Sequence, residues 1–412
     1  MQNISTTCCV VGGGPAGMML GFLLARAGVK VHVLEKHGDF LPDFRGDTVH
    51  PSTLELMHEL GILTEFLKRP HSEVTELGAH IGNDFIRFAN FTQINAKCKF
   101  LAFMPQWDFL NFLAEQAKRF PSFNLMMKTE ATDVLTEGDR IVGVRANGTD
   151  GPVEIRADLV VSCDGRNSEL REKTAMHVRE FGAPMDVLWF KLSRKAGDPP
   201  EALGRVETGT LMVMLNRNDY WQCGFIIAKG GFDDIKQAGL ESFRARVAKV
   251  APFVADRVGE IESFDQVKLL TVRVDRLEQW YRQGFLCIGD CAHAMSPVGG
   301  VGINLAIQDA VASANLLWKP LSEGNVTEAD LQSVQERRLY PTRMTQRFQL
   351  FIQDRVVKTV LESKKAIHAP APLKAFNVFN GLRTIPATVI GIGFRPEHIH
   401  SPYVKTSKDK GG

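Results

Sequence analysis

The chain has 412 residues, of which 44% are hydrophobic and 23% charged, and its net charge is +2. This length and composition are typical of a globular protein of two or three domains with a substantial core. So small a net charge creates no strong field, which argues against nucleic acid or an anionic membrane surface as a partner.

We expect no signal peptide in the first residues. No positive charge precedes the first apolar run, so a signal peptide is not expected. The apolar stretch 18–25 is interrupted by Gly21 and is shorter than the about 20 residues that span a bilayer. We therefore expect no membrane span.

A strand, a helix and a second strand follow one another at the N-terminus. Residues 6–11 form a β-rich apolar run, and residues 15–27 have a helical pattern that Gly28 ends. Residues 29–34 then alternate as a second strand. This is the βαβ order in which a glycine-rich turn is typical of a dinucleotide-binding site.

The turn between the first strand and the helix has the pattern GxGxxG. Gly12 permits the tight turn, Gly14 lets the backbone approach a pyrophosphate, and Gly17 allows close packing of helix against strand. The helix that begins near Pro15 directs free amide groups at the phosphates. The pattern in this setting predicts a dinucleotide-binding site.

An acidic residue ends the second strand. Glu35 lies 18 residues after Gly17, where its carboxylate can accept hydrogen bonds from both ribose hydroxyls. An acid at this point favours an unphosphorylated ribose, as in FAD or NAD, over NADP.

A second glycine-rich turn lies about 280 residues further along. Residues 284–290 enter a buried strand, and Asp290 falls at its carboxyl end, where ligands bind in open α/β sheets. Gly299, Gly300 and Gly302 follow, and then a helical pattern over 303–318. A helix N-terminus there would stabilise the negative charge of a reduced flavin. The two turns together favour a flavoenzyme over a nicotinamide dehydrogenase.

Three motifs in this order resemble those of a known family. Between the two turns, residues 157–168 form a third motif that contains Asp164-Gly165. The chain resembles the para-hydroxybenzoate hydroxylase-like, single-component FAD-dependent aromatic monooxygenases (group A flavoprotein hydroxylases). The match covers roughly residues 8–320. Cys163 and Cys291 stand where small residues are usual in the family.

The resemblance implies further contacts to FAD. It implies that Arg45 touches the phosphate and ribityl region, that Gln106 lies beside the cofactor and Val134 near the adenine, and that the loop from Pro297 lines the isoalloxazine. Asp290, by its place at the strand end, can hydrogen-bond the ribityl chain. The predicted cofactor-binding residues are Gly12, Gly14, Pro15, Ala16, Gly17, Glu35, Lys36, Arg45, Gln106, Val134, Asp164, Gly289, Asp290, Pro297, Gly300, Val301, Gly302, Ile303 and Asn304.

The resemblance also implies a reaction. NAD(P)H would reduce FAD, dioxygen would add to the flavin at C4a, and the hydroperoxide would hydroxylate a hydrophobic phenolic or N-heteroaromatic ring. A second GxGxxG is absent, which agrees with a nicotinamide that binds transiently. The sequence does not identify a catalytic base, and neither His50 nor His293 is selected for that role.

The predicted fold class is α/β, with a Rossmann-type FAD-binding domain assembled from residues 1–75, 98–175 and 272–325. Residues 76–97 and 176–271 would form an inserted antiparallel β-sheet domain for the substrate. Residues 326–412 are expected to be mainly helical, with breaks at Pro341, Pro370 and Pro372.

Three strand-like runs, 187–192, 210–215 and 220–227, suggest the antiparallel sheet, with a turn cluster at 216–219. A hairpin is predicted at 137–139. By alternation, neighbouring apolar side chains of the sheet share a face. Either they line a substrate pocket or they are ordinary core. The pocket candidates are Met212, Met214, Trp221, Phe225 and Pro297.

Three other functions use related machinery. A flavin-dependent halogenase is disfavoured, because its Trp-x-Trp-x-Ile-Pro signature is absent. A reductase or dehydrogenase acting on a quinone or lipid without oxygen insertion, and a non-catalytic flavin sensor, stay open. The seven cysteines show no CxxC pair and no zinc-ligand spacing, so we expect no metal and reduced thiols in a cytoplasmic protein.

Overall fold

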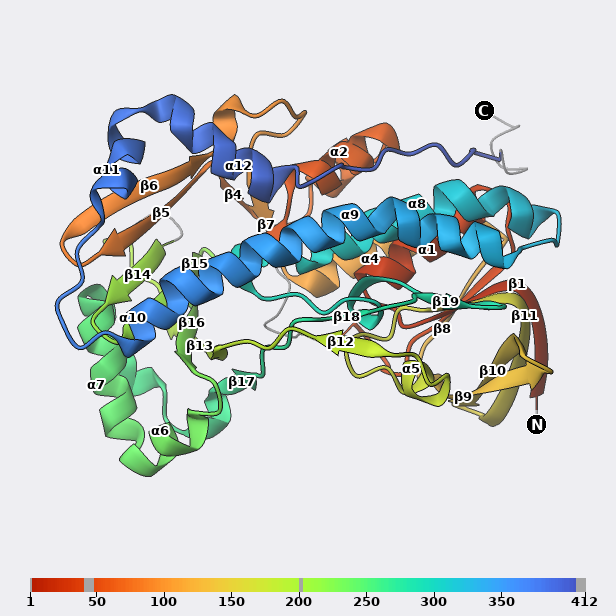
Figure 1. The fold of residues 1–412 in the computed structure, drawn as a ribbon, viewed down its shortest axis with the longest axis horizontal. Helices are drawn as coiled ribbons and strands as arrows, with labels where there is room; N and C mark the ends of the chain where they lie inside the picture. Colours follow the sequence, from red (N-terminus) through yellow and green to blue (C-terminus); the bar gives the residue numbers. More distant parts are fainter. Residues whose placement is uncertain (1, 41–47, 200–202, 405–412) are drawn as a thin grey trace.

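The computed structural model describes residues 2–40, 48–199 and 203–404. Its fold is mixed α/β, with one large sheet near the termini and a second at the opposite end of the molecule (Figure 1). The long helix α9 (Glu328–Ile352) runs diagonally between the two ends. The predicted contact at Arg45 lies outside the described residues.

The first sheet is built around parallel strands. Its strand order is β19-β20-β11-β1-β2-β8, and the β9–β10 hairpin extends β11. Helix α1 (Pro15–Arg26) connects β1 to β2 and packs against α4 (Gln106–Ala117) and α8 (Gly302–Ser322). The strands are β1 (Gln2–Val11), β2 (Val31–Leu34), β8 (Phe123–Met126), β9 (Glu130–Glu137), β10 (Arg140–Gly148), β11 (Gly151–Ser162), β19 (Tyr281–Arg282) and β20 (Phe285–Cys287).

The second sheet is mostly antiparallel, in the order β17-β13-β16-β15-β14-β5-β6. Residues far apart in sequence meet in it, because β5 pairs with β14. Helices α6 (Phe232–Ala238) and α7 (Leu240–Val250) lie at the lower left of Figure 1 beside this sheet. The strands are β5 (Glu76–Ile81), β6 (Asp84–Asn90), β13 (Met185–Ser193), β14 (Leu203–Glu207), β15 (Thr210–Asn216), β16 (Tyr220–Ala228) and β17 (Lys268–Leu270).

Smaller elements connect the two ends. A two-stranded ribbon of β12 (Val178–Glu180) and β18 (Asp275–Leu277) lies between the two large sheets (Figure 1). A three-stranded sheet joins β3 (Thr48–Val49), β4 (Ser72–Val74) and β7 (Leu101–Phe103). The further helices are α2 (Pro51–Glu59), α3 (Leu63–Phe66), α5 (Glu169–Lys173), α10 (Lys358–Glu362), α11 (Ala371–Val378) and α12 (Thr384–Gly391).

The predicted local elements are confirmed in most places. The helix that follows the first glycine turn ends before Gly28, whose φ of +85° suits glycine. The hairpin at 137–139 and the turn at 216–219 connect antiparallel strands as predicted. Pro370 precedes helix α11 and Pro372 lies in its first turn.

The predicted break at Pro341 is wrong. Pro341 is buried inside α9, which continues for 11 residues beyond it, to Ile352. A proline within a helix costs about 3 kcal/mol because one hydrogen bond is lost. The capping box of Thr327 and Asp330 and a continuous buried face along α9 stabilise the helix enough to offset that cost.

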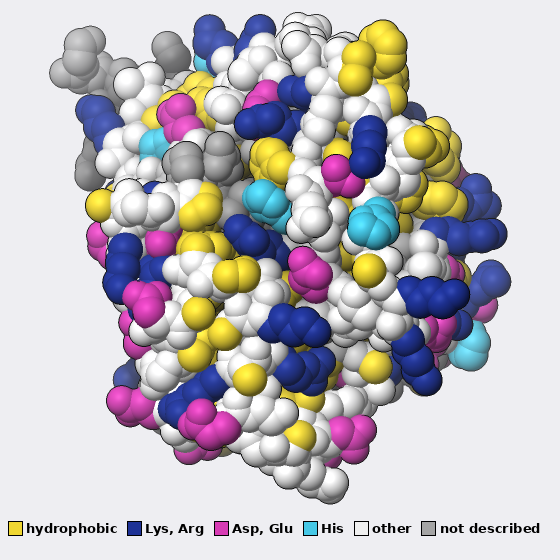
Figure 2. Space-filling view, turned by 90° about the vertical axis from the view of Figure 1, so that its left-hand side faces the viewer, with side chains coloured by type: hydrophobic (Ala, Val, Ile, Leu, Met, Phe, Trp, Pro, Cys, Tyr) yellow, Lys and Arg dark blue, Asp and Glu magenta, His cyan; other side chains and the backbone are white. Residues whose placement is uncertain are grey.

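On the face of the molecule in Figure 2, charges of one sign do not gather in a single patch. Lys and Arg side chains there are interspersed with Asp, Glu and hydrophobic ones, in agreement with the small net charge. Within the described residues, no helix has the length and apolar character needed to traverse a bilayer. All seven cysteines are described as free thiols.

Candidate functional site

The predicted motifs meet at one edge of the parallel sheet. The registers align Val11 of β1 with Leu34 of β2 and with Ser162 of β11, and Ser162 with Cys287 of β20. The four strands therefore end side by side. Since each motif follows a strand end, the predicted binding residues of distant segments lie together at this edge. The residues that follow these ends include Gly12, Glu35, Asp164 and Gly289.

The first turn is compact in the way its glycines predict. Gly12 has a φ of +103°, and a Cβ on it would lie 2.6 Å from the carbonyl oxygen of Cys163. The first motif thus touches the middle one. A Cβ on Gly17 would lie 1.9 Å from the carbonyl oxygen of Gly12, so α1 approaches the turn too closely for any side chain.

The start of α1 is free to receive an anion. Gly14 is its N-cap and has no side chain to satisfy the first amides, and Pro15 occupies the first turn. A Cβ on Gly14 would meet no described residue within 4 Å, so among these residues open space lies in front of this helix end. The adjacent Ala16 is buried. Uncapped amides beside open space are suited to a phosphate group.

Glu35 closes this region from the second strand. Its Oε2 accepts a hydrogen bond from the amide of Gly13 at 2.9 Å, and its Oε1 accepts one from the amide of His37. The exposed Lys36 follows it. Thr129, directly before β9, donates its amide to the carbonyl oxygen of Glu35, so the strand that carries half-buried Val134 starts beside this acid.

The middle and third motifs are joined by an ion pair. Arg166 Nη2 donates to Asp290 Oδ2 at 2.7 Å, and both side chains are partly exposed. Asp164 Oδ1 accepts from Ser162 Oγ at 2.5 Å. Burial raises the pKa of Asp164, against the hydrogen bonds from Ser162 and Ser168 that lower it.

The loop of the third motif leads into α8. Gly299 and Gly300 have φ values of +80° and +62°, so the chain turns through the left-handed region before the helix. Val301 is the N-cap of α8 and makes no side-chain cap, which leaves the amides of the first turn, including Gly302 and Ile303, available. The loop from Pro297 therefore ends in a second uncapped helix N-terminus.

Helix α2 supports this loop from outside. Asn304 Oδ1 accepts from Ser52 Oγ at 3.0 Å and from Thr53 Oγ1 at 2.6 Å. His50 is fully buried, with Nε2 3.3 Å from the carbonyl oxygen of Gly299. Burial lowers the pKa of His50 to about 4, so its imidazole is neutral at pH 7 and its Nε2–H donates to that oxygen.

His293 and Gln106 occupy different settings. His293 is buried and lies 2.5 Å from Asp309 Oδ2, which also accepts from the amide of Gly289 at 3.1 Å. The histidine belongs to a buried ionic cluster behind the motif. Gln106 is half-buried in the first turn of α4, which packs against α1.

The four candidate pocket residues of the antiparallel sheet lie on the face that is turned away from the loop that begins at Pro297. Met212, Met214, Trp221 and Phe225 are fully buried in a cluster that includes Phe243 and Val247 of α7. The opposite face, which carries Trp189, Leu211 and Val213, packs with Val298 of the loop. The structure therefore does not bring these four together with Pro297, and on their face the ordinary-core interpretation describes the packing.

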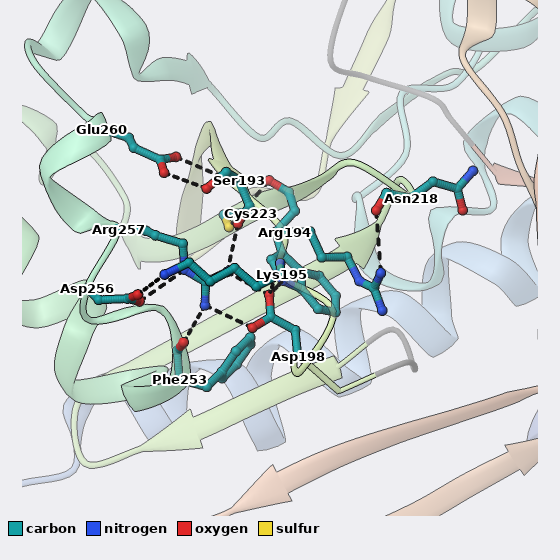
Figure 3. A network of polar contacts seen from close by, with 11 residues as sticks. Ser193, Arg194, Lys195, Asp198, Asn218, Cys223, Phe253, Asp256, Arg257 and Glu260 are labelled. Atoms are coloured by element: carbon teal, nitrogen blue, oxygen red, sulfur yellow. Dashed lines mark hydrogen bonds and ion pairs between the residues drawn. The ribbon is translucent and has the colours of Figure 1, made fainter.

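A polar network fixes Trp221 on that outer face. Its Nε1 donates to Asp198 Oδ2 at 2.8 Å. Arg257 binds both oxygens of Asp198 at 2.7 and 2.9 Å (Figure 3). Burial alone would raise the pKa of Asp198, but the hydrogen bonds from Arg257, the Lys195 amide and Trp221 lower it below its ordinary range. Trp221 thus has a structural partner already.

Several residues of the site had no signal of their own in the sequence. Arg166 follows Asp164-Gly165 closely, yet only the fold reveals Asp290 as its partner. Gln349 lies in α9, and its Nε2 donates to the carbonyl oxygens of Ser296 at 2.8 Å and Val298 at 2.9 Å. A run of glutamines at 346, 349 and 353, which share one side of a helix, was the available signal.

Comparisons with known proteins agree with this geometry. The family model described as FAD binding domain matches residues 5–348. The 6-methylpretetramide 4-monooxygenase of Streptomyces rimosus is 30% identical over 375 residues, 89% of this chain and 88% of that protein. The dialkyldecalin synthase of Streptomyces rugosporus is 28% identical over 333 residues, 77% of this chain, and that match spans 65% of the synthase.

A solved structure supports the fold. The crystal structure of a probable FAD-dependent monooxygenase from Pseudomonas aeruginosa superimposes with a TM-score of 0.74 at 21% identity. The match covers 87% of this chain and 97% of the other.

Proposed function

The chain belongs to the FAD binding domain family, as one of its para-hydroxybenzoate hydroxylase-like members, and on that premise we propose that it hydroxylates a hydrophobic aromatic compound. The reductant would be NADH or NADPH and the oxidant dioxygen. We propose a phenolic or N-heteroaromatic ring as the substrate. The relative from Streptomyces rimosus, a monooxygenase by name, supports oxygen insertion over a plain dehydrogenase reaction.

The observation that carries this proposal is the convergence of three distant motifs at one sheet edge. Two uncapped helix N-termini, those of α1 and α8, begin beside that edge. The open space at Gly14 and the carboxylate of Glu35 fit the pyrophosphate and a ribose of a Rossmann-type site. The described residues therefore fit FAD.

The protein's own groups would then bind and orient. Bound FAD supplies the redox chemistry, and the N-terminus of α8 would stabilise negative charge on the pyrimidine edge of the reduced ring. Asp290, held by Arg166, would accept hydrogen bonds from the ribityl chain. We propose that residues 1–75, 98–175 and 272–325 hold the cofactor, and that residues 76–97 and 176–271 cover the substrate.

We propose that the substrate lies against the inner face of the antiparallel sheet, the face that carries Trp189 and Val213. These side chains share a cluster with Val298 of the cofactor loop. The indole Nε1 of Trp189 is buried and has no hydrogen-bond partner within the described residues, so it can donate to a polar group of the substrate. Gly224 leaves room for this indole, because a Cβ there would lie 3.0 Å from the ring.

Labelled oxygen tests the proposed reaction. The FAD-loaded protein should consume NADH or NADPH faster when the correct aromatic compound is added, and mass spectrometry should find the label from ¹⁸O₂ in the product. A panel of phenols, anilines and quinolones covers the proposed substrate class. Label that enters only from water, or turnover with an artificial acceptor and no oxygen insertion, would refute the monooxygenase proposal.

Replacement of Asp290 by alanine should weaken FAD retention while the protein stays folded. A hydrogen bond to a charged group contributes about 1.5–3 kcal/mol, so FAD affinity should fall about tenfold to a hundredfold. Fluorescence titration of the apoprotein with FAD measures it. Glu137→Ala, which removes an exposed partner of Arg156, is the control and should bind FAD as wild type does. Unchanged affinity in Asp290→Ala would remove this aspartate from the site.

Trp189 and Phe190 are neighbours on β13 and pack on opposite faces of the sheet, so variants at these positions test which face binds the substrate. Trp189→Ala should raise the half-saturating substrate concentration about tenfold or more, since an aromatic contact and a hydrogen bond are both lost. Phe190→Ala should instead lower the free energy of unfolding by about 3–5 kcal/mol, because Phe190 is buried against Phe243. Substrate-stimulated NAD(P)H consumption and urea unfolding measure the two effects. The reverse pattern would place the substrate on the α7 side.

A further inference from the structure

Four arginines surround a cavity of about 280 Å³ whose described lining includes no residue of the predicted flavin motifs. Arg179 comes from β12, Arg276 from β18, and Arg343 and Arg347 from α9. The other lining residues are Phe181, Gln346 and Leu350. Water occupies about 30 Å³ per molecule, so the cavity has room for a ligand of several heavy atoms.

The arginines are arranged in pairs that repel one another. Arg179 and Arg276 lie directly opposite in the antiparallel β12–β18 ribbon, and Arg343 and Arg347 are one helical turn apart on α9. Like charges at both kinds of position are destabilising. The burial of Arg276, together with the charges of Arg343, Arg179 and Arg347, lowers its pKa to about 10. The fold thus maintains an unfavourable concentration of positive charge.

The described residues that line the cavity include neither Asp nor Glu, although Glu180 and Asp275 adjoin Arg179 and Arg276 in the β12–β18 ribbon. Within residues 2–40, 48–199 and 203–404, none of the four arginines forms an ion pair. The guanidinium groups of Arg179, Arg343 and Arg347 belong to exposed residues, so a ligand from solution can reach them.

Two of the arginines are held in position without a counter-charge. Arg276 donates from Nη1 to Gln346 Oε1 at 2.6 Å and lies 5.0 Å from the ring of Phe181. Arg179 lies 5.5 Å from the same ring. Contact with an aromatic ring orients a guanidinium and leaves its donors free for a bidentate acceptor.

Helix α9 connects this cavity to the cofactor loop. Gln346 donates from Nε2 to the carbonyl oxygen of Asp275 at 2.7 Å, and Gln349 binds the carbonyl oxygens of Ser296 and Val298. One side of the helix thus carries two arginines, and another holds the loop that leads to α8. Residues of α9 therefore both line the cavity and bind the loop from Pro297.

We propose that this arginine cluster binds the pyrophosphate group of a phosphate-bearing small molecule. Paired guanidinium groups match phosphate oxygens bidentately, and an anion would relieve the repulsion within both pairs. On the proposed function, which this step assumes, NADPH or NADH supplies the pyrophosphate. Another organic diphosphate would present the same group, so the experiment separates the two sources.

Binding of inorganic pyrophosphate tests the site itself. Isothermal titration of the FAD-loaded protein should detect pyrophosphate binding that weakens as salt is added. Arg343→Gln/Arg347→Gln should weaken this binding about a hundredfold, or about tenfold per arginine. Without ligand, the double variant should melt no lower than wild type, since a like-charge pair is removed. Lys68→Gln/Lys249→Gln removes two exposed charges elsewhere and should bind as wild type does.

The outcomes separate the site from its occupant. Absence of pyrophosphate binding to wild type, or equal binding to the arginine variant, overturns the site. Anaerobic reduction of the flavin in the double arginine variant then identifies the source of the pyrophosphate. If the variant needs about tenfold or more NADPH or NADH for half-saturation and keeps the limiting rate of wild type, the cluster binds the reductant. Pyrophosphate binding with unchanged reduction assigns it to another diphosphate. If neither NADPH nor NADH reduces the flavin of the wild-type protein, the proposed function is refuted. The pyrophosphate titration still tests the arginine cluster in that case.

Discussion

Gly17→Ala is expected to yield protein that retains almost no FAD and is less stable by about 3 kcal/mol, the upper end of the cost of overpacking. The added methyl would lie 1.9 Å from the carbonyl oxygen of Gly12 and 3.2 Å from Val10 Cγ1. Backbone cannot yield as a flexible side chain does. Helix α1 would therefore have to move away from β1, and the phosphate-binding turn would open.

Gly14→Ala is the matched control, because it adds the same methyl to the same turn. Gly14 has φ −72° and ψ −174°, which alanine adopts, and its Cβ would meet no atom of the residues that the structure describes within 4 Å. Its free energy of unfolding without FAD should match wild type, while its FAD affinity should fall if the pyrophosphate occupies that space. Urea unfolding and FAD titration measure both. A Gly17→Ala protein with wild-type stability and FAD content would contradict the packing described for the turn.

Arg338→Met is expected to lower the free energy of unfolding at pH 7 by about 3–5 kcal/mol, the usual cost of breaking a buried ion pair. Arg338 is almost fully buried, and its Nε donates to Asp309 Oδ1 at 2.8 Å while Nη1 donates to Glu397 at 3.1 Å. Methionine fills a similar volume but leaves the Asp309 carboxylate without this partner. The adjacent Arg337 also pairs with Glu397 but is about one-third exposed, so Arg337→Met should cost about 1 kcal/mol or less.

The loss of unfolding free energy in Arg338→Met should depend on pH. Burial would raise the pKa of Asp309, but His293 and Arg338 lower it below its ordinary value of about 3.9. A depressed carboxyl pKa contributes stability above the unfolded value, and that contribution is lost as pH falls through the folded value. The difference between variant and wild type should therefore be largest near pH 7 and shrink below about pH 4. A difference that grows in acid would contradict this assignment.

The same variant should loosen the cofactor site. Asp309 Oδ2 accepts from the amide of Gly289, so Arg338 acts on the third motif through that carboxylate. Glu397 joins the cluster from the C-terminal segment, where the sequence offered no chemistry to assign. Its role follows from packing that brings it, Arg338 of α9 and Asp309 of α8 together.

The local patterns of the chain predicted the glycine turns and the strand ends around the proposed site. A GxGxxG turn needs its glycines for steric reasons that act within a few residues, and the contacts at Gly12 and Gly17 agree with that prediction. Strand ends are likewise visible as apolar runs that stop at Glu35 and Asp290. Parallel strands then align their carboxyl ends in register, so the convergence of the motifs follows from the fold class.

Long-range packing settled the rest. Period-two alternation shows that Met212 and Met214 share a face, but both faces of this sheet are apolar, and only α7 determines that theirs is the outer one. Pro341 stays helical because tertiary contacts along α9 outweigh its local cost. The arginines from β12, β18 and α9 are separated by up to 168 residues, between 179 and 347, and become one cluster only where these elements meet. Local sterics act within a turn and leave their mark in the sequence, whereas the choice between two apolar faces depends on what covers each of them.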